Sequence, residues 1–474
     1  MYDTPIPPIP WQITGNHWIA LPCIHPVDGS IHAVGTLHRG ARAAVEFAGS
    51  ERFADGGGPA LSRPSLAIDG VPVNWSDTPL AWERALHWLP TFTATVGNLV
   101  VRATIFAPYG RDADTAGAVY AFAFENRSQQ AINVTVGLEG YLGHRQLRVR
   151  TPRPFIDAHA VRRGMTEAVI LGGSAVPGLA GMAIGADGAA TIDVPNEQAY
   201  AIRREVRVPP QGHADAAFFL AVGPEGDGAE ATVAVMRRRG WRSLLAATRD
   251  TLRALEQTTG HEGIDTIINR NLLFAYFYGV GRALDDAHFY LCRTRVPWHS
   301  RGVTVREWES LIWTVPAVQL ADAPLARELI LRACELHGYS PGTGVRYLDG
   351  TLFEPGFSLE GPGRMRSRST GTSARRATTR SSRNRSSPTR CTARTRTSTR
   401  AGTSRSRSSP PRSRRPGVRP RSRTPCTATP SRRRRWMSSA GRSTKRRHAR
   451  WRIRTRCAPH SNDTLPASAM ARRS

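Results

Sequence analysis

The chain has 474 residues, enough for two or three domains, and a formal net charge of +29 that is spread unevenly along it. Residues 363–474 hold 34 Lys and Arg against one acid (+33), whereas residues 1–362 hold 32 Lys and Arg against 36 Asp and Glu (−4). The body is therefore an ordinary, slightly acidic protein, and the high isoelectric point belongs to the tail.

Cysteine usage and hydropathy exclude several other classes of protein. The cysteines of the body, Cys23, Cys292 and Cys334, form no CxxC pair, which argues against a disulfide framework and against a zinc site. The first residues lack the basic and apolar regions of a secretory signal, and no stretch approaches the roughly 18 apolar residues of a membrane span. We expect a cytoplasmic protein that contacts no membrane.

Residues 1–229 are predicted to form a β-sandwich domain, because short β-branched and aromatic runs alternate with Gly, Pro, Asn and Asp. The candidate strands are 17–24, 43–47, 91–106 with a turn at Gly97-Asn98, 118–125, 132–139 and 216–222. The clearest hairpin is predicted between 118–125 and 132–139, since Asn126, Arg127 and Ser128 supply turn residues between two alternating strands.

A helical period replaces the strand period near Glu230. We predict a helical linker over 230–262, a helix over 264–284 and another over 303–320 that Pro316 can bend. Asp322 is a good N-cap for a partner helix that ends at Gly338, so these last two helices form an αα-hairpin. A long loop, 339–361, follows and is the kind of segment that usually carries function.

The tail, residues 363–474, is predicted to be disordered, because it has too few apolar residues to offset the entropy of ordering it. Of its 112 residues, 100 are Gly, Arg, Ser, Thr, Ala, Pro, Cys or Trp, the types whose codons have G or C in the middle position. A GC-rich gene read one nucleotide forward produces this set, so we favour a frameshift near residues 360–366. A genuine low-complexity tail and an RNA-binding arm are the alternatives.

The body resembles the six-hairpin glycosidases, the (α/α)6-barrel group that includes glucoamylase-like, glycogen-debranching and glycoside phosphorylase enzymes. The motifs that carry the resemblance are FAYFYGVGRALDD (274–286), CRTRVPWHSRG (292–302), REWESLIW (306–313), LARELILRACELHG (325–338) and DGTLFEPGFSLEG (349–361). The resemblance implies a supersandwich-like β domain followed by an (α/α)6 catalytic toroid, of which 263–362 would be the N-terminal part. Many relatives have Arg-Asp where Arg306-Glu307 stands here, and the acid and base usually come from later loops.

Acidic, aromatic and arginine residues collect in this central stretch. Cleavage of a glycosidic bond needs one protonated and one ionised carboxyl group, and we assign these roles to Glu309 and Glu360. Glu307 and Glu309 diverge on a helix, so at most one of them points into a site. The predicted substrate contacts are Arg306, Trp308, Trp298, Asp349 and Glu354.

Simpler structural roles compete with these assignments. An ion pair between Arg306 and Glu309 is one alternative, a turn-shaping role for Asp349 is another, and core packing is a third for Trp308, Trp313 and Trp298. We find no metal-ligand cluster, no P-loop and no catalytic triad, so we expect no cofactor.

The sequence thus predicts a multidomain β-then-α protein that hydrolyses O-glycosidic bonds in oligosaccharides, with a partial toroid that leaves this chain inactive or very weak. A non-catalytic sugar-binding protein is one alternative, and a nucleic-acid-binding protein that acts through the Arg-rich tail is the other.

Overall fold

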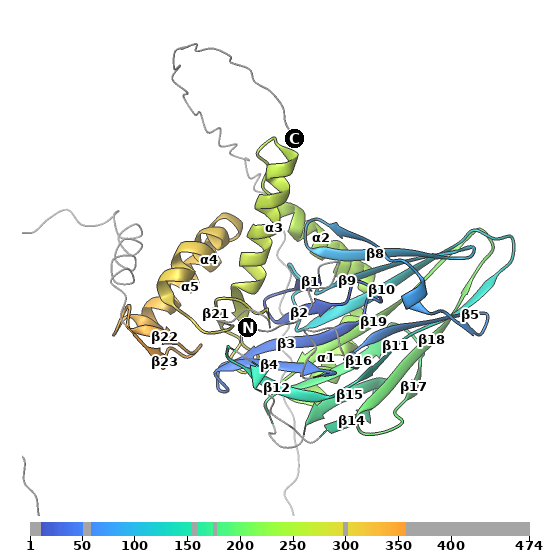
Figure 1. The fold of residues 1–474 in the computed structure, drawn as a ribbon, viewed down its shortest axis with the longest axis horizontal. Coiled ribbons are helices and arrows are strands. Elements are labelled where there is room, and N and C mark those ends of the chain that lie inside the picture. Colours follow the sequence, from blue (N-terminus) through green and yellow to red (C-terminus); the bar gives the residue numbers. More distant parts are fainter. Residues whose placement is uncertain are drawn as a thin grey trace, which may run out of the picture. The chain divides into compact units, whose positions relative to one another are not determined.

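The structure is a computed structural model that describes residues 11–50, 58–150, 152–153, 159–173, 178–296 and 302–356. Strands fill the described chain as far as Gly223, and helices with two short hairpins follow (Figure 1). The order of β elements before helices is as predicted. In the part that the structure describes, no helix is long and apolar enough to cross a membrane. The prediction of disorder for 363–474 lies outside the described residues.

The strands before Gly223 form three antiparallel sheets among the described residues. The six-stranded sheet contains β1 (Gln12–Gly15), β2 (Ile19–Ile24), β3 (Ile31–His38), β4 (Ala43–Ala48), β12 (His144–Arg148) and β13 (Pro152–Arg153). The eight-stranded sheet contains β14 (His159–Arg163), β15 (Ala168–Gly173), β16 (Gly181–Ala186), β19 (His213–Gly223), β10 (Gly117–Asn126), β9 (Leu99–Phe106), β8 (Leu89–Val96) and β7 (Ala81–Ala85). The five-stranded sheet contains β17 (Thr191–Asp193), β18 (Ala199–Val208), β11 (Ile132–Tyr141), β5 (Arg63–Ile68) and β6 (Val71–Pro72), and a short 3-10 helix, η2 (Trp75–Asp77), follows β6.

The middle strands of the eight-stranded sheet, β10 and β19, are buried on both faces over most of their length. Successive side chains of a strand point to opposite faces, so Tyr120, Phe122 and Phe124 of β10 enter the core between the sheets. Val119 and Ala121 point the other way and pack in a second core together with the helices. Each predicted strand segment contains an observed strand, because residues buried in this way are the apolar ones that mark strands in the sequence.

The predicted hairpin between β10 and β11 is wrong. β10 pairs with β9 and β19, whereas β11 pairs with β5 and β18 of the five-stranded sheet. The segment that connects β10 to β11 is held by Asn126, whose buried amide donates to Gln130 O (2.7 Å) and Pro209 O (3.0 Å). Alternation in the sequence shows that a strand has a buried face, but it does not show which sheet the strand joins.

The predicted linker over 230–262 is two helices and not one. α1 (Gly226–Arg239) and α2 (Trp241–Leu255) meet at Gly240, whose φ of 79° lies in the left-handed region that glycine tolerates best. α1 packs on β16 and β19 through Val233 and Met236 (Figure 1).

The next helix, α3 (Glu262–Tyr278), ends before the predicted residue 284. Residues that were expected to continue it form β20 (Val280–Arg282), which pairs with β21 (Phe289–Leu291). Gly281 lets β20 pass close to β3, because an added Cβ there would lie 2.3 Å from Leu37 Cδ1. After α3 ends at Tyr278, the chain runs as the strand β20 alongside β3.

The αα-hairpin is confirmed, with corrected bounds. α4 (Glu307–Ala321) and α5 (Ala323–His337) flank Asp322, whose Oδ1 accepts a hydrogen bond from Leu325 N at 3.0 Å. α4 begins after residue 303 because Val305 is extended and exchanges backbone hydrogen bonds with Arg346. The predicted loop is in part a hairpin of β22 (Gly344–Arg346) and β23 (Leu352–Pro355).

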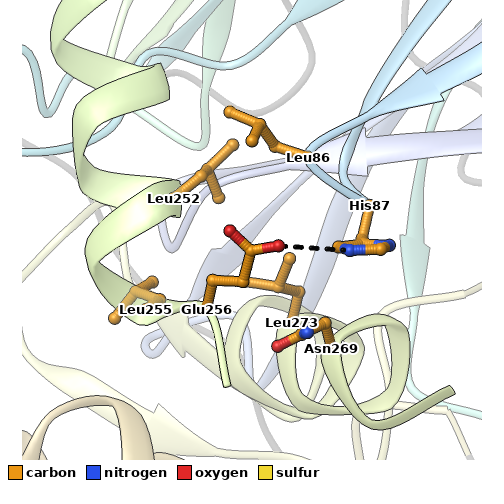
Figure 2. A pocket seen from close by; sticks show the side chains of 7 residues that line it. All are labelled: Leu86, His87, Leu252, Leu255, Glu256, Asn269 and Leu273. Carbon is orange, nitrogen blue, oxygen red and sulfur yellow. Dashed lines mark ion pairs between the residues drawn. The ribbon is translucent and has the colours of Figure 1, made fainter. Parts of the chain in front are cut away.

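Polar contacts join the helices to the β sheets. The Arg295 guanidinium donates to the carbonyl oxygens of Asn16 and Phe277. Figure 2 shows a second contact, where His87 Nε2 lies 3.7 Å from Glu256 Oε1 among leucines of α2 and α3. Side chains fill that hollow and leave essentially no room for a ligand, so this contact is structural.

Candidate functional site

The two acids at the start of α4 point in different directions, as their spacing predicts. The side chain of Glu307 is 1% exposed, and its Oε1 accepts a hydrogen bond from Gly342 N. Glu309 instead points to Arg293, whose Nε lies 2.6 Å from Glu309 Oε2. In the described part of the chain, the ion-pair partner of Glu309 is therefore Arg293 and not Arg306, which stands at the N-cap position of α4.

The Glu309–Arg293 pair is largely removed from water, with side chains that are 14% and 6% exposed. A buried pair of this kind holds its carboxylate in a defined position, although its net contribution to stability is small. Arg293 comes from the segment 292–302 that was noted for its arginines, but it was not predicted as a site residue. Arg293 follows β21 after one residue, and its backbone N–H donates to Thr304 O at 3.2 Å, three residues before α4 begins.

His337 and Arg346 are neighbours of Glu307 that the sequence did not suggest. Burial lowers the pKa of His337 to about 4, while the nearby Glu307 carboxylate acts in the opposite direction. Arg346 donates hydrogen bonds to Gly350 O and Ser340 O, each at 2.8 Å, and so holds the chain between α5 and β23. Neither residue stands out in the sequence, since His337 is an ordinary residue at a helix end and Arg346 lies in the predicted loop 339–361.

Several buried polar atoms in this region have no hydrogen-bond partner in the described chain. They are Glu307 Oε2, Trp308 Nε1, Ser310 Oγ, His337 Nδ1 and Arg346 Nε. An unpaired buried polar group costs about 1–3 kcal/mol, and native proteins keep few of them. We call these five residues the α4 polar cluster. Its unpaired atoms include acceptors, donors and a hydroxyl that can do both.

The two acids of the hairpin are held at its surface. Arg42 Nε lies 2.7 Å from Asp349 Oδ2, and Thr351 donates two hydrogen bonds to Asp349 Oδ1. Burial by itself would raise the pKa of Asp349, but the Thr351 hydrogen bonds and the Arg42 charge outweigh it and lower the pKa. These contacts fit the turn-shaping alternative for Asp349.

Glu354 is more open than Asp349. Its Oε2 lies 2.5 Å from Arg150 Nη2, and its side chain is 51% exposed. The Arg150 guanidinium also lies 5.0 Å from the centre of the Phe353 ring. One carboxylate oxygen of Glu354 thus has an ion partner while half of the side chain still faces solvent.

The remaining predicted residues differ in position. Trp308 is half-buried and belongs to the α4 polar cluster, whereas Trp313 on the same helix is 73% exposed. Trp298 and Glu360 lie outside the described residues, so the pairing of Glu309 with Glu360 stays a prediction. Within the described ranges, no three His, Cys, Asp or Glu side chains come together as metal ligands.

Comparisons with known proteins give weak similarities. The chain matches no protein-family profile and no curated protein. It is similar to a solved structure described as "Putative kojibiose phosphorylase from human microbiome", with 8% identity, a TM-score of 0.46 and coverage of 69% of this chain and 46% of that one. A bacterial glucoamylase complexed with acarbose gives 8% identity, a TM-score of 0.40 and coverage of 73% and 54%.

A galactose mutarotase related enzyme from Lactobacillus acidophilus gives 10% identity, a TM-score of 0.27 and coverage of 44% of this chain and 96% of that one. The chain spans about half the length of the phosphorylase and of the glucoamylase. At TM-scores below 0.5, these likenesses assign neither a family nor an activity to the chain.

Proposed function

We propose that the chain is a carbohydrate-active, glycoside hydrolase-like protein and that the α4 polar cluster is one wall of its sugar site. The observation that carries the proposal is the group of unpaired buried polar atoms on α4, α5 and β22, and α4 also carries Glu309 of the Glu309–Arg293 pair. Sugar hydroxyls donate and accept hydrogen bonds, so they match a wall that offers both kinds of atom. The motifs that resemble six-hairpin glycosidases fall on the same elements.

In the proposed mechanism, Glu309 and Glu360 are the carboxyl pair of glycoside hydrolysis. Arg293 would fix the Glu309 carboxylate in position through their ion pair, which suits the base or nucleophile rather than the proton donor. Arg306, Trp308, Trp298, Asp349 and Glu354 would contact the sugar. Because Asp349 is held by Arg42 and Thr351, we expect Glu354 to contribute more to binding than Asp349.

We further propose that the (α/α)6 toroid is incomplete and that this chain is inactive or very weak. Large apolar side chains are exposed on the helices, among them Ile267 at 63%, Trp313 at 73% and Leu320 at 65%. Further helices of a closed toroid would cover such faces. The composition of 363–474 supports a frameshift as the reason that those helices are missing.

The sugar site is tested by calorimetric titration of the full chain with a panel of neutral disaccharides. Trp308→Phe removes one buried N–H and keeps an aromatic ring, so we expect it to weaken binding at least about fivefold, the effect of one lost hydrogen bond. The half-buried Trp241 of α2 provides the control, Trp241→Phe, which should leave binding unchanged. The proposal is wrong if no disaccharide binds, or if Trp308→Phe binds disaccharides as tightly as the parent does.

The inactivity is tested separately by assaying sugar release from oligosaccharides. Measurable turnover by the full chain would overturn the inactivity claim and leave the sugar site standing. The frameshift is tested by the nucleotide sequence, in which the alternative frame after codon 360 should encode further amphipathic helices. Stop codons in that frame would contradict it.

Nucleic-acid binding is the second candidate, and the 34 basic residues of 363–474 favour it. Phosphate neutralisation releases counterions, so binding of the full chain to RNA should weaken steeply as salt increases. A preference for one RNA sequence that persists at physiological salt would support this function against the carbohydrate proposal.

A further inference from the structure

The solvent face of the five-stranded sheet carries two adjoining hollows, far in sequence from the α4 polar cluster. Their volumes are about 390 and 340 Å³, and both are lined by Arg63, Glu139 and Arg203. Small-molecule sites in proteins are typically about 300–1,000 Å³, so each hollow has the size of a ligand site. We call the two together the sheet groove.

The strand period of β11 explains why the sheet groove exists. Val134, Val136 and Leu138 enter the core, so Thr135, Gly137 and Glu139 face the opposite side. Gly137 lies opposite Ser65 on one neighbouring strand and opposite Arg203 on the other. Short side chains therefore form the floor of the groove, and longer charged ones form its walls.

Gly137 keeps this floor low. A Cβ at this position would lie 2.5 Å from Ile202 O and 2.9 Å from Arg203 Cγ, closer than real contacts allow. A glycine inside a strand weakens the strand and often marks a place where another backbone or a ligand approaches closely. In β11 this glycine lies between Ser65 and Arg203, two residues that line the groove.

The charged walls offer hydrogen-bond donors and acceptors in alternation. Arg63 Nε lies 3.3 Å from Asp28 Oδ2, and Arg203 Nη2 lies 3.6 Å from Glu139 Oε2. Both arginine side chains are about half exposed, at 50% and 41%, and a guanidinium has five N–H donors. Each arginine can thus keep its ion pair and still donate to a ligand.

The sign of the charges selects the class of ligand. Two arginines face Asp28, Glu139 and Asp193, so the groove has no positive excess that would attract an anion. Alternating donors and acceptors with no net positive charge fit a neutral ligand that is rich in hydroxyl groups. Tyr141 lines the second hollow and adds an aromatic ring to its wall.

We propose that the sheet groove is a second carbohydrate site, which holds a stretch of neutral polysaccharide apart from the site at α4. The choice of carbohydrate as the ligand rests on the proposed function, whereas the existence of the site rests on the groove itself. Two adjoining hollows that share one wall would accommodate consecutive sugar units of one chain.

The test is affinity electrophoresis of the full chain in gels that contain amylopectin, dextran or pullulan. These polymers are neutral, so the basic tail does not attract them. We expect at least one to retard the protein, and the double variant Arg203→Ala/Glu139→Ala to weaken this binding at least tenfold. The matched control is Arg102→Ala/Glu83→Ala, which removes an exposed ion pair from the eight-stranded sheet and should change nothing.

A second variant fills the groove without changing its charge. Ser65→Trp should block binding as strongly as the double variant, and thermal melting monitors whether each variant is folded. The variant Trp241→Phe lies outside both proposed sites and should leave retardation unchanged.

The outcomes separate this inference from the proposed function. Retardation that the groove variants leave intact overturns the groove site. Loss of retardation in Trp308→Phe alone also overturns it and supports the α4 site. Absence of retardation by every polymer overturns the groove site, whereas the disaccharide titration decides the α4 site independently.

Discussion

The β-sheet part and the helical part of the chain bury their apolar side chains to different extents. Three large apolar residues are exposed in the described chain up to Gly223, namely Val27, Val71 and Met165. Seven are exposed from α3 onwards, namely Ile264, Ile267, Trp313, Leu320, Leu331, Tyr339 and Leu352. The β sheets thus close a core around their own side chains, while the helices keep faces that nothing in the described chain covers.

This difference shows where the stability of the chain resides. A core that is packed on all sides contributes to stability with every buried methylene group, whereas an exposed apolar side chain contributes almost nothing. Substitutions in the two parts should therefore differ in their effect on the free energy of unfolding.

The largest effect is expected in the sandwich core. Phe122 is 1% exposed and stacks on Tyr120 with 4.7 Å between ring centres, so Phe122→Ala should lower the unfolding free energy by about 3–5 kcal/mol. Urea denaturation followed by circular dichroism measures this change. Trp313→Ala on α4 should change it by less than about 0.5 kcal/mol. Equal losses in the two variants would contradict the comparison.

The next effect concerns a buried ion pair of the six-stranded sheet. Arg148 Nε lies 2.5 Å from Glu46 Oε1 and both side chains are 1% exposed, so Arg148→Met leaves a buried carboxylate unpaired. We expect a loss of about 3 kcal/mol in the same denaturation experiment. Removal of the exposed Arg127–Glu125 pair by Arg127→Met should leave stability essentially unchanged, because solvent screens the two charges.

The third effect depends on pH and tests the helical part. The pKa of His337 is about 4 in the fold and 6.5 ordinarily, so between these values the unfolded chain binds more protons than the folded one. The free energy of unfolding therefore contains the full contribution of neutral His337 above pH 6.5. This contribution is lost as the pH falls toward 4, at up to about 1.4 kcal/mol per pH unit.

His337→Gln should remove this contribution and reduce the slope of unfolding free energy against pH over that range, while His17 and His32, whose pKa values burial lowers to about 3 and about 4, keep their own contributions. His213, which is exposed on β19, provides the control variant His213→Gln, and its profile should follow the parent. A slope in His337→Gln that is unchanged from the parent would contradict the role of His337 and leave the titration to other groups.

The smallest effect tests the join between α4 and α5. Asp322 caps α5 by accepting from Leu325 N, so Asp322→Ala should lower stability by about 1 kcal/mol, and Asp322→Asn should restore most of it. Thermal melting resolves a change of this size. A loss as large as that of Phe122→Ala would show that the helical hairpin is as tightly coupled to the core as the sheets are.

Local patterns in the sequence account for most of the elements. Alternation located β10 and β11, and Asp322 followed by Pro324 located the start of α5. Carboxylates at the start of α4 were predicted from residue type alone, and the divergence of Glu307 and Glu309 followed from helical spacing. Such features depend on residues close together in the chain, and so they can be read without the fold.

Partners far apart in the chain could not be predicted in this way. The sequence by itself determined that strands precede helices, that a helical hairpin follows them, and that a basic tail of different composition ends the chain. Only the tertiary structure decided that β10 and β11 join different sheets, that Glu309 pairs with Arg293, and that Glu307 is buried beside His337. The physical reason is that spacing determines which face of an element a side chain lies on, whereas packing between distant segments determines what that face meets.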